Sequence, residues 1–195
     1  MSKETLKTIG KIGLGVCMTA ITGFYALEES IGYVSRVDGV SMQDTLNPSK
    51  SRKQHDYVFL SKSHNLLKKG NIKHGDIVSI KSPRHPEKYL IKRIVGLEGD
   101  IVKIPENTKI NKRWDNPEGT LNYTKRTIQV PQGHCWVEGD NARMSEDSNK
   151  FGPISIGLIT AKATHVVWPP HRRKRLESIE APPERVIKEC QQLNI

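Results

Sequence analysis

A chain of 195 residues has room for one compact domain with short extensions, so two full domains are not expected. Its 31 lysines and arginines against 21 aspartates and glutamates give a formal net charge of +10, which indicates a nearby anionic surface, either membrane or nucleic acid. The sequence contains no recognition helix, zinc finger or RNA-stacking motif, which argues against nucleic acid. Its cysteines are few and scattered, and it lacks a phosphate-binding loop, so neither a metal nor a cofactor is expected.

The first predicted element is an uncharged run at residues 12–27, preceded by lysines and followed by two glutamates. It is shorter than the about 20 residues that a helix needs to cross a hydrocarbon core of about 30 Å, but flanking lysines can reach the interface. We expect a retained anchor rather than a cleaved targeting peptide, because no small-x-small cleavage site follows. Residues 1–35 are therefore assigned to a membrane anchor with its flanks, with the remainder across the membrane by the positive-inside rule.

Residues 38–48 follow, and they place the Ser41 hydroxyl in a short polar loop. A glycine lets the backbone pass close to a ligand, apolar side chains can be buried beside the serine, and Asn47-Pro48 closes the stretch as a turn. Ser41 is the candidate nucleophile, although a solvated turn serine is the alternative from this stretch alone. The candidate substrate contacts are Gly39, Met42 and Leu46.

From residue 56 onward, short segments rich in β-branched and aromatic residues alternate with turn residues. Strands are expected at residues 56–61, 76–81, 89–95, 101–104, 127–130, 135–138 and 158–168. Short strands with short connections predict a curled or barrel-like antiparallel sheet, and we assign residues 36–170 to it. Residues 171–195 are assigned to a polar tail in which the basic run 172–175 is solvated and the apolar spacing over 183–193 predicts a short helix.

Two adjacent cations, Lys92 and Arg93, interrupt the apolar strand at 89–95. Alternation puts them on opposite faces, so periodicity does not decide which one is buried. An arginine stays protonated in a protein, whereas a desolvated lysine can lose about 3 pKa units from about 10.4. Lys92 is therefore the candidate base, and the alternative is that both cations extend outward from an edge strand.

A third stretch, at residues 138–153, is dense in small hydrogen-bonding side chains. Ser145 can accept an N–H of a neighbouring lysine, while Asp147 and Asn141 can hold the backbone in place. An ordinary loop rich in aspartate and asparagine is the alternative interpretation.

Taken in order, the three stretches resemble the type I signal peptidase family, over about residues 10–170. The residues that carry the resemblance are Ser41-Met42 and Leu46, then Lys92 to Asp100, then Gly139-Asp140-Asn141 with Ser145, Asp147, Ser148 and Gly152. Residues 41–43, 46–48, 164–170 and 176–185 are similar to family members of the mitochondrial inner membrane in particular. Relatives from the endoplasmic reticulum carry a histidine in place of Lys92, which favours the bacterial and organellar branch.

The resemblance implies a mainly β, signal-peptidase-like curled antiparallel sheet behind an N-terminal transmembrane helix, and a membrane-anchored serine endopeptidase without cofactors. In the implied dyad, Lys92 takes the proton of Ser41 and the Ser41 backbone N–H donates to the oxyanion. The implied supporting residues are Ser145, which would orient the lysine, with Asp147, Asp140 and Asn141.

The implied substrates are proteins delivered to the mitochondrial intermembrane space, whose sorting presequences the enzyme would remove. Such a substrate would lie extended along a strand edge, with small side chains before the cleaved bond. The resemblance also implies a heteromer with a homologous catalytic subunit, and a catalytic domain that faces the intermembrane space.

This sequence departs from the family pattern at several positions. Gly39 stands where many bacterial relatives have a serine that completes the oxyanion hole, so the second donor is unassigned. Gln43-Asp44 replaces a proline common after the Ser-Met pair, Glu98 replaces another proline, and Asn149 replaces an arginine that often pairs with the residue matching Asp147.

Two other functions compete with the protease. A structural partner that stabilises a sister subunit without cutting is indicated by Gly39 and Asp44. A self-cleaving regulator would use related Ser/Lys chemistry, but the absence of a DNA-binding domain and the apolar run at 12–27 count against it.

We predict that the full chain does not bind DNA or RNA specifically at about 0.15 M salt, because its positive charge is spread thinly and non-specific binding at this salt is weak. Fluorescence anisotropy with labelled duplex and single-stranded oligonucleotides measures this directly. A dissociation constant below about 1 μM would overturn the prediction.

Overall fold

The computed structural model describes residues 31–48, 55–62, 71–105, 123–124 and 126–188, together with positions 16, 18, 19 and 23, which are helical. Apart from these four positions, the predicted anchor at residues 12–27 lies outside the described residues. No helix among the described residues is long and apolar enough to cross a membrane.

The described residues form mainly short strands. The strands are β1 (Gly32–Arg36), β2 (Tyr57–Ser61), β3 (Ile77–Lys81), β4 (Tyr89–Gly96), β5 (Ile101–Lys103), β6 (Tyr123–Thr124), β7 (Thr127–Gln129), β8 (His134–Glu138), β9 (Ile154–Ser155), β10 (Ile159–Trp168), β11 (Lys174–Arg175) and β12 (Val186–Ile187). One α-helical turn, α2 (Ser148–Phe151), and 3-10 turns at Ala142–Met144, Ile156–Leu158 and Pro170–Arg172 complete the secondary structure.

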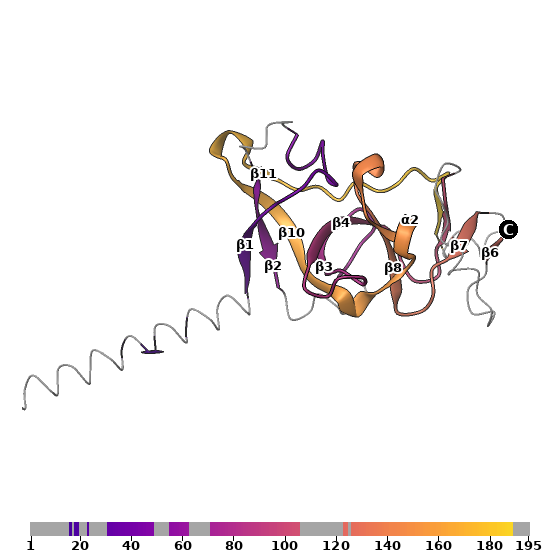
Figure 1. The fold of residues 1–195 in the computed structure, drawn as a ribbon, viewed down its shortest axis with the longest axis horizontal. Helices are drawn as coiled ribbons and strands as arrows, with labels where there is room; N and C mark the ends of the chain where they lie inside the picture. The colour runs from indigo at the N-terminus through magenta and orange to yellow at the C-terminus, as the bar shows by residue number, and fades with distance from the viewer. Residues whose placement is uncertain are drawn as a thin grey trace, which may run out of the picture.

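Two antiparallel sheets make up the body. The larger, eight-stranded sheet has the order β1-β2-β10-β3-β4-β8-β9, with β11 added beside β10, and the smaller sheet has the order β12-β5-β7-β6. The long strand β10 curls the larger sheet, because its first part pairs with β3 and its second part, after an irregularity in register, pairs with β2 (Figure 1). This arrangement confirms the predicted curled antiparallel sheet.

Buried side chains form three clusters that follow the sheets. One lies beneath the loop after β1 and joins Met42 and Leu46 to β2 and β10. A second lies among β3, β4 and β8, and the third fills the smaller sheet around Trp136. Strand β4 is buried from residue 92 to its end, as expected for a strand with packing on both faces.

The predicted strands match β2, β3, β4, β5, β7, β8 and β10 to within about one residue at each end, which is the usual uncertainty of an element boundary. Strand β1, which begins at residue 32, was not predicted because it was assigned to the flank of the anchor. The short strands β6, β9, β11 and β12 were missed as well, since two residues carry no periodicity.

The helix predicted at residues 183–193 is wrong over its described part. Residues 183–185 form a turn, and β12 then pairs with β5. Val186 is buried in the smaller sheet, and this tertiary contact overrides the helical spacing.

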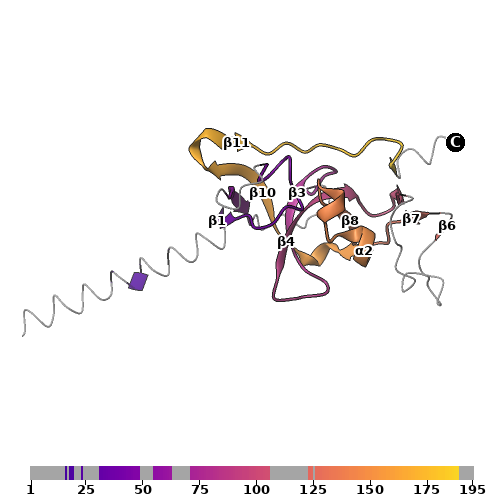
Figure 2. The same cartoon turned by 45° about the horizontal axis from the view of Figure 1, so that its top comes forward.

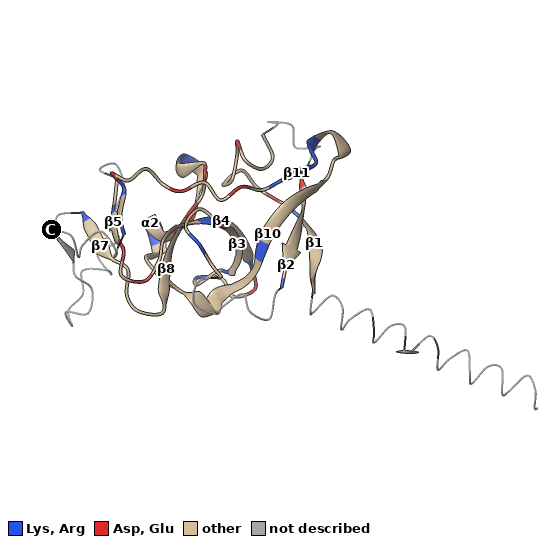
Figure 3. Cartoon of the chain, turned by 180° about the vertical axis from the view of Figure 1, so that it is seen from behind, with Lys and Arg blue, Asp and Glu red and all other residues tan. Residues whose placement is uncertain are grey.

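The basic run at residues 172–175 is also only partly solvated, because Arg172 forms an ion pair with the buried Asp56. Residues 170–188, which we call the C-terminal strap, run along the body from β11 towards the smaller sheet (Figure 2). Lysines and arginines are distributed over elements at both ends of the body (Figure 3).

The strap crosses Gly75 so closely that we predict a steric penalty for any side chain there. Gly75 has a φ of 81°, and an added Cβ would lie 2.6 Å from the backbone carbonyl carbon of Ile179. Gly133 has a similar φ of 70° but open space around the added atom. Gly133→Ala should therefore cost only the conformational penalty of about 1 kcal/mol, and Gly75→Ala should cost more than about 2 kcal/mol.

Urea denaturation of the two variants measures this difference in the free energy of unfolding. Equal losses of stability in Gly75→Ala and Gly133→Ala would show that the strap does not pack tightly at Ile179.

Candidate active site

The loop after β1 places Ser41 at the surface of the first cluster. Met42 and Leu46 are buried beneath it, and the Leu46 N–H donates to the Met42 carbonyl at 2.8 Å. The Asn47 side chain donates to the carbonyl of Val37 at 2.8 Å and to that of Gly39 at 3.2 Å. The serine therefore sits on a loop that is fixed from both ends.

Strand β4 supplies both cations, and both are buried on opposite faces of the strand. Lys92 is 2% exposed and Arg93 is 7% exposed. The alternative in which both extend into solvent is therefore wrong. The Lys92 amine lies 2.7 Å from Ser41 Oγ and donates to the Ile91 carbonyl at 3.0 Å.

Burial lowers the pKa of the Lys92 amine from its ordinary value of 10.5 to about 8. The negative charges of Asp147, Glu146 and Asp140 raise this pKa, but they do not outweigh the loss of water around the amine. The positive charge of Lys150 lowers the pKa further. A substantial fraction of the amine is thus neutral slightly above physiological pH, and a neutral amine has the lone pair that a base requires.

The buried charge of Arg93 is stabilised by an ion pair. Its Nε and Nη2 donate to the two carboxylate oxygens of Asp140, both at 2.8 Å, in a bidentate fork. Thr45 also donates to Asp140 through its hydroxyl. Arg93 therefore joins β4, the serine loop and the loop after β8, a role that the sequence analysis did not identify.

The loop after β8 holds the serine loop through its backbone. The Asn141 N–H donates to the Ser41 carbonyl at 3.0 Å, and its side chain donates to the Val40 carbonyl at 3.1 Å. Asp147 accepts the Gly139 N–H at 3.0 Å and also caps α2. The backbone contacts expected of Asn141 and Asp147 are thus present.

Asn149 takes over contacts to Asp147 that the family pattern gives to an arginine. Both its backbone N–H and its side-chain amide donate to the same Asp147 oxygen at 3.1 Å. Asp147 therefore keeps hydrogen-bond partners within the loop although Asn149 stands in place of the arginine.

Ser145 does not make the bond predicted for it. Its side chain is buried, but Oγ has no hydrogen-bond partner among the described residues. A Cβ added to Gly139 would lie 2.4 Å from Ser145 Oγ and from the Ser41 carbonyl oxygen, so the hydroxyl lies against this backbone. The Lys92 amine is oriented by Ile91 and Ser41 instead.

A groove of about 420 Å³ opens beside Ser41 and Lys92. Its lining residues are Tyr33, Ser35, Arg36, Val37, Asp38, Gly39, Ser41, Met42, Leu60, Ser79, Tyr89, Leu90, Ile91 and Lys92. Within the described sheet, β1 is an edge strand and β8 pairs with β4 only from Arg93 onward, so β1 and residues 89–92 both offer unpaired backbone. The groove therefore fits an extended peptide.

The predicted substrate contacts divide into two groups. Gly39 and Met42 line the groove, but Leu46 is fully buried in the first cluster and cannot touch a ligand, so that prediction was wrong. Gly39 has a φ of 92°, a conformation that a serine adopts only with strain. A serine placed at this position would therefore strain the loop of this chain.

Other chemistry has little support in the described residues. No group of three or more His, Cys, Asp or Glu side chains in this part of the chain is placed to hold a metal ion. Burial raises the pKa of the Cys135 thiol to about 12, which makes this cysteine inert as a nucleophile.

The chain matches a known protein family and is similar in sequence to several known proteins. The family model described as signal peptidase, peptidase S26, matches residues 7–168, a range that contains both Ser41 and Lys92. The chain is 45% identical over 157 residues to mitochondrial inner membrane protease subunit 2 of Mus musculus, covering 80% of this chain and 78% of that protein. It is 44% identical over 158 residues to the Homo sapiens protein of the same name, covering 81% of this chain and 79% of that protein.

Among solved structures, a signal peptidase I from Enterococcus faecalis is 26% identical to this chain, with a TM-score of 0.35. The alignment covers 47% of this chain and 95% of that one.

We predict that Lys92→Met raises the free energy of unfolding at pH 7 by about 1 to 2 kcal/mol. A shift of the pKa from 10.5 to about 8 means that the folded protein binds the proton less tightly, which costs about 3 kcal/mol below pH 8. The lost hydrogen bonds offset part of the gain. Because the cost of burying the charge fades as the pH rises from 8 towards 10.5, the variant's advantage should be smaller at pH 10.

Denaturant unfolding at both pH values measures this, with Lys88→Met, which removes an exposed lysine nearby, as the control. A Lys92→Met protein that is less stable than the parent at pH 7 would contradict the lowered pKa of the buried amine.

Proposed function

Because the chain belongs to the signal peptidase S26 family, we propose that it is a membrane-anchored serine endopeptidase with a Ser41–Lys92 dyad. The observation that carries the proposal is the 2.7 Å distance between a buried amine with a pKa of about 8 and a hydroxyl that lines a peptide-sized groove. One amine then performs the proton transfers that a histidine and an aspartate share in a triad.

Acylation begins when the neutral Lys92 amine accepts the proton of the Ser41 hydroxyl as Oγ attacks the scissile carbonyl. The new C–O bond turns the carbonyl oxygen into an oxyanion, to which the Ser41 backbone N–H donates. The tetrahedral intermediate then collapses, the C–N bond breaks, and the Lys92 ammonium returns its proton to the departing amine. An ester between Ser41 and the N-terminal part of the substrate remains.

Deacylation uses the same amine a second time. Lys92, again neutral, accepts a proton from a water molecule that attacks the ester carbonyl. The second intermediate collapses, the bond to Ser41 Oγ breaks, and the proton returns to the serine. Burial of the amine serves both steps, because an amine with a pKa near 10.5 would be almost fully protonated at neutral pH.

The relatives and the groove support a proposal for the substrate class. The similar proteins of mouse and human are named as subunits of the mitochondrial inner membrane protease. We therefore assign this chain to that membrane, with its β domain in the intermembrane space, where it removes sorting presequences from delivered proteins. An extended presequence would pair with β1 and with residues 89–92. This chain would act in a complex with a homologous catalytic subunit.

We predict that Ser41→Ala and Lys92→Met each lower the rate of presequence cleavage by at least about 1,000-fold, because each removes one member of a unit that acts together. Ser155→Ala and Lys88→Met, which change exposed residues outside the groove, should cleave at the parental rate. The assay follows cleavage of a precursor by the full-length protein in its native membrane complex.

Normal cleavage by the folded Ser41→Ala variant would refute the dyad. Full complementation of a deletion by that variant would instead favour a structural subunit that stabilises a catalytic sister.

A further inference from the structure

The C-terminal strap, residues 170–188, pairs with the body through β11 and β12, and three further side-chain contacts, called tethers here, hold it to the body. It begins where β10 ends and runs across the body towards the smaller sheet (Figure 2). The sequence analysis assigned this stretch to a polar tail without a role. Its contacts indicate otherwise.

The first tether joins the strap to the serine loop. Arg172 donates through Nε and Nη2 to the two carboxylate oxygens of Asp56, at 2.7 and 2.8 Å. Asp56 in turn accepts the Asn47 N–H at 2.8 Å, and the Asp56 N–H donates to the Asn47 side chain at 2.7 Å. The same asparagine side chain holds the carbonyls of Val37 and Gly39, so this chain of bonds ends two residues from Ser41.

The second tether joins the strap to the strand that carries the lysine. Arg93, next to Lys92, donates through Nη1 to the Glu177 carbonyl of the strap at 3.2 Å and to the Gly75 carbonyl at 2.7 Å. Ser178 donates to Asp76, whose side chain also accepts the Lys162 amine at 2.6 Å.

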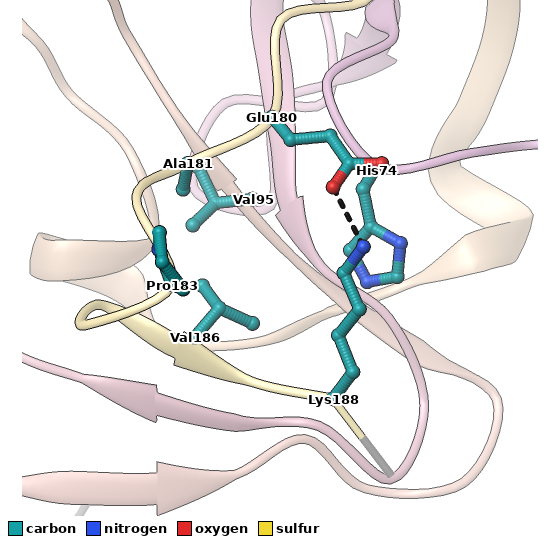
Figure 4. A pocket seen from close by; sticks show the side chains of 7 residues that line it. All are labelled: His74, Val95, Glu180, Ala181, Pro183, Val186 and Lys188. Carbon is teal, nitrogen blue, oxygen red and sulfur yellow. Dashed lines mark hydrogen bonds and ion pairs between the residues drawn. The ribbon is translucent and has the colours of Figure 1, made fainter. Parts of the chain in front are cut away.

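The third tether joins the strap to the end of β8. Arg185 pairs with Glu138, the last residue of β8, which also accepts the Trp136 indole N–H at 2.8 Å. Between the second and third tethers, strap residues and body residues line a pocket of about 270 Å³ (Figure 4). His74 and Val95 of the body line this pocket, and the strap is held there at its two ends.

Burial decides which tether matters most for the serine. The Asp56 side chain is 3% exposed, and a buried carboxylate is stable only when it is paired and hydrogen-bonded. Arg172 is the cation that pairs with it. Without the fork, the buried Asp56 carboxylate would lose its paired cation, and its hydrogen bonds to Asn47 would be less well held.

We propose that Arg172 is a positioning residue for the proposed peptidase, and that the strap fixes the serine loop through Asp56 and Asn47. The inference rests on the proposed function for its catalytic consequence, but the ordering of the loop is independent of it. Arg172 touches no reacting atom and acts on Ser41 through the loop alone.

The test compares Arg172→Lys with Arg173→Lys in the full-length protein in its native complex. Arg172→Lys keeps the charge beside Asp56 but loses the bidentate fork. Arg173 is the exposed neighbour in the strap, and among the described residues its side chain donates to the Val167 carbonyl alone. Hydrogen exchange of residues 37–48, followed by mass spectrometry, reports the order of the loop without any need for cleavage.

We expect Arg172→Lys to speed amide exchange in residues 37–48 by at least about tenfold, and to lower kcat by about tenfold with KM changed less than about twofold. The midpoint of the pH–rate profile should stay near 8, because the surroundings of Lys92 are unchanged. Arg173→Lys should match the parent in every measurement.

Parental exchange in residues 37–48 of a folded Arg172→Lys protein would overturn the proposal, as would faster exchange with a parental kcat. A shifted pH midpoint would also overturn it, since the effect would then act through Lys92. If Ser41→Ala cleaves normally, the proposed function fails, while faster exchange in Arg172→Lys would still show that the strap orders the loop.

Discussion

The burial of one lysine amine beside one hydroxyl is the constraint that the rest of the structure serves. Desolvation brings the Lys92 pKa to about 8, and nearby carboxylates limit the fall by favouring the charged form. None of these carboxylates lies within salt-bridge distance of the amine among the described ion pairs. The site therefore combines a dry environment with carboxylates held at a distance, and this combination sets the pKa of the amine near 8, as the proposed base requires.

The neighbouring Arg93 on the same strand keeps its charge and is paired with a carboxylate. Because side chains alternate along a strand, Lys92 and Arg93 face different sides, and each side supplies a different environment. Lys92 receives a hydroxyl and a carbonyl, whereas Arg93 receives a carboxylate fork from Asp140 and two carbonyls. The permanent charge of Arg93 is thus neutralised and joins two loops to β4, while Lys92 forms no ion pair with any described residue.

The sequence predicted those features that depend on local pattern, and missed those that depend on long-range contact. The β-branched runs located seven strands, and the pairing of Ser41 with Lys92 followed from the family resemblance. Leu46 was assigned to the wrong environment, because apolar residues beside a nucleophile can face either ligand or core. The fork between Arg172 and Asp56 joins residues 116 positions apart, and no periodicity in either segment indicates it. Ser145 shows that a matched motif does not by itself determine which hydrogen bonds form.

The position of the strap in the chain has a consequence for biogenesis. The strap follows Ser41, Lys92 and the loop after β8 in sequence, so during translation it leaves the ribosome after all of them. A nascent chain that has already paired β1 to β10 would still lack the contact between Arg172 and Asp56. If the proposed positioning role of Arg172 holds, the serine loop becomes ordered only at this last stage of folding.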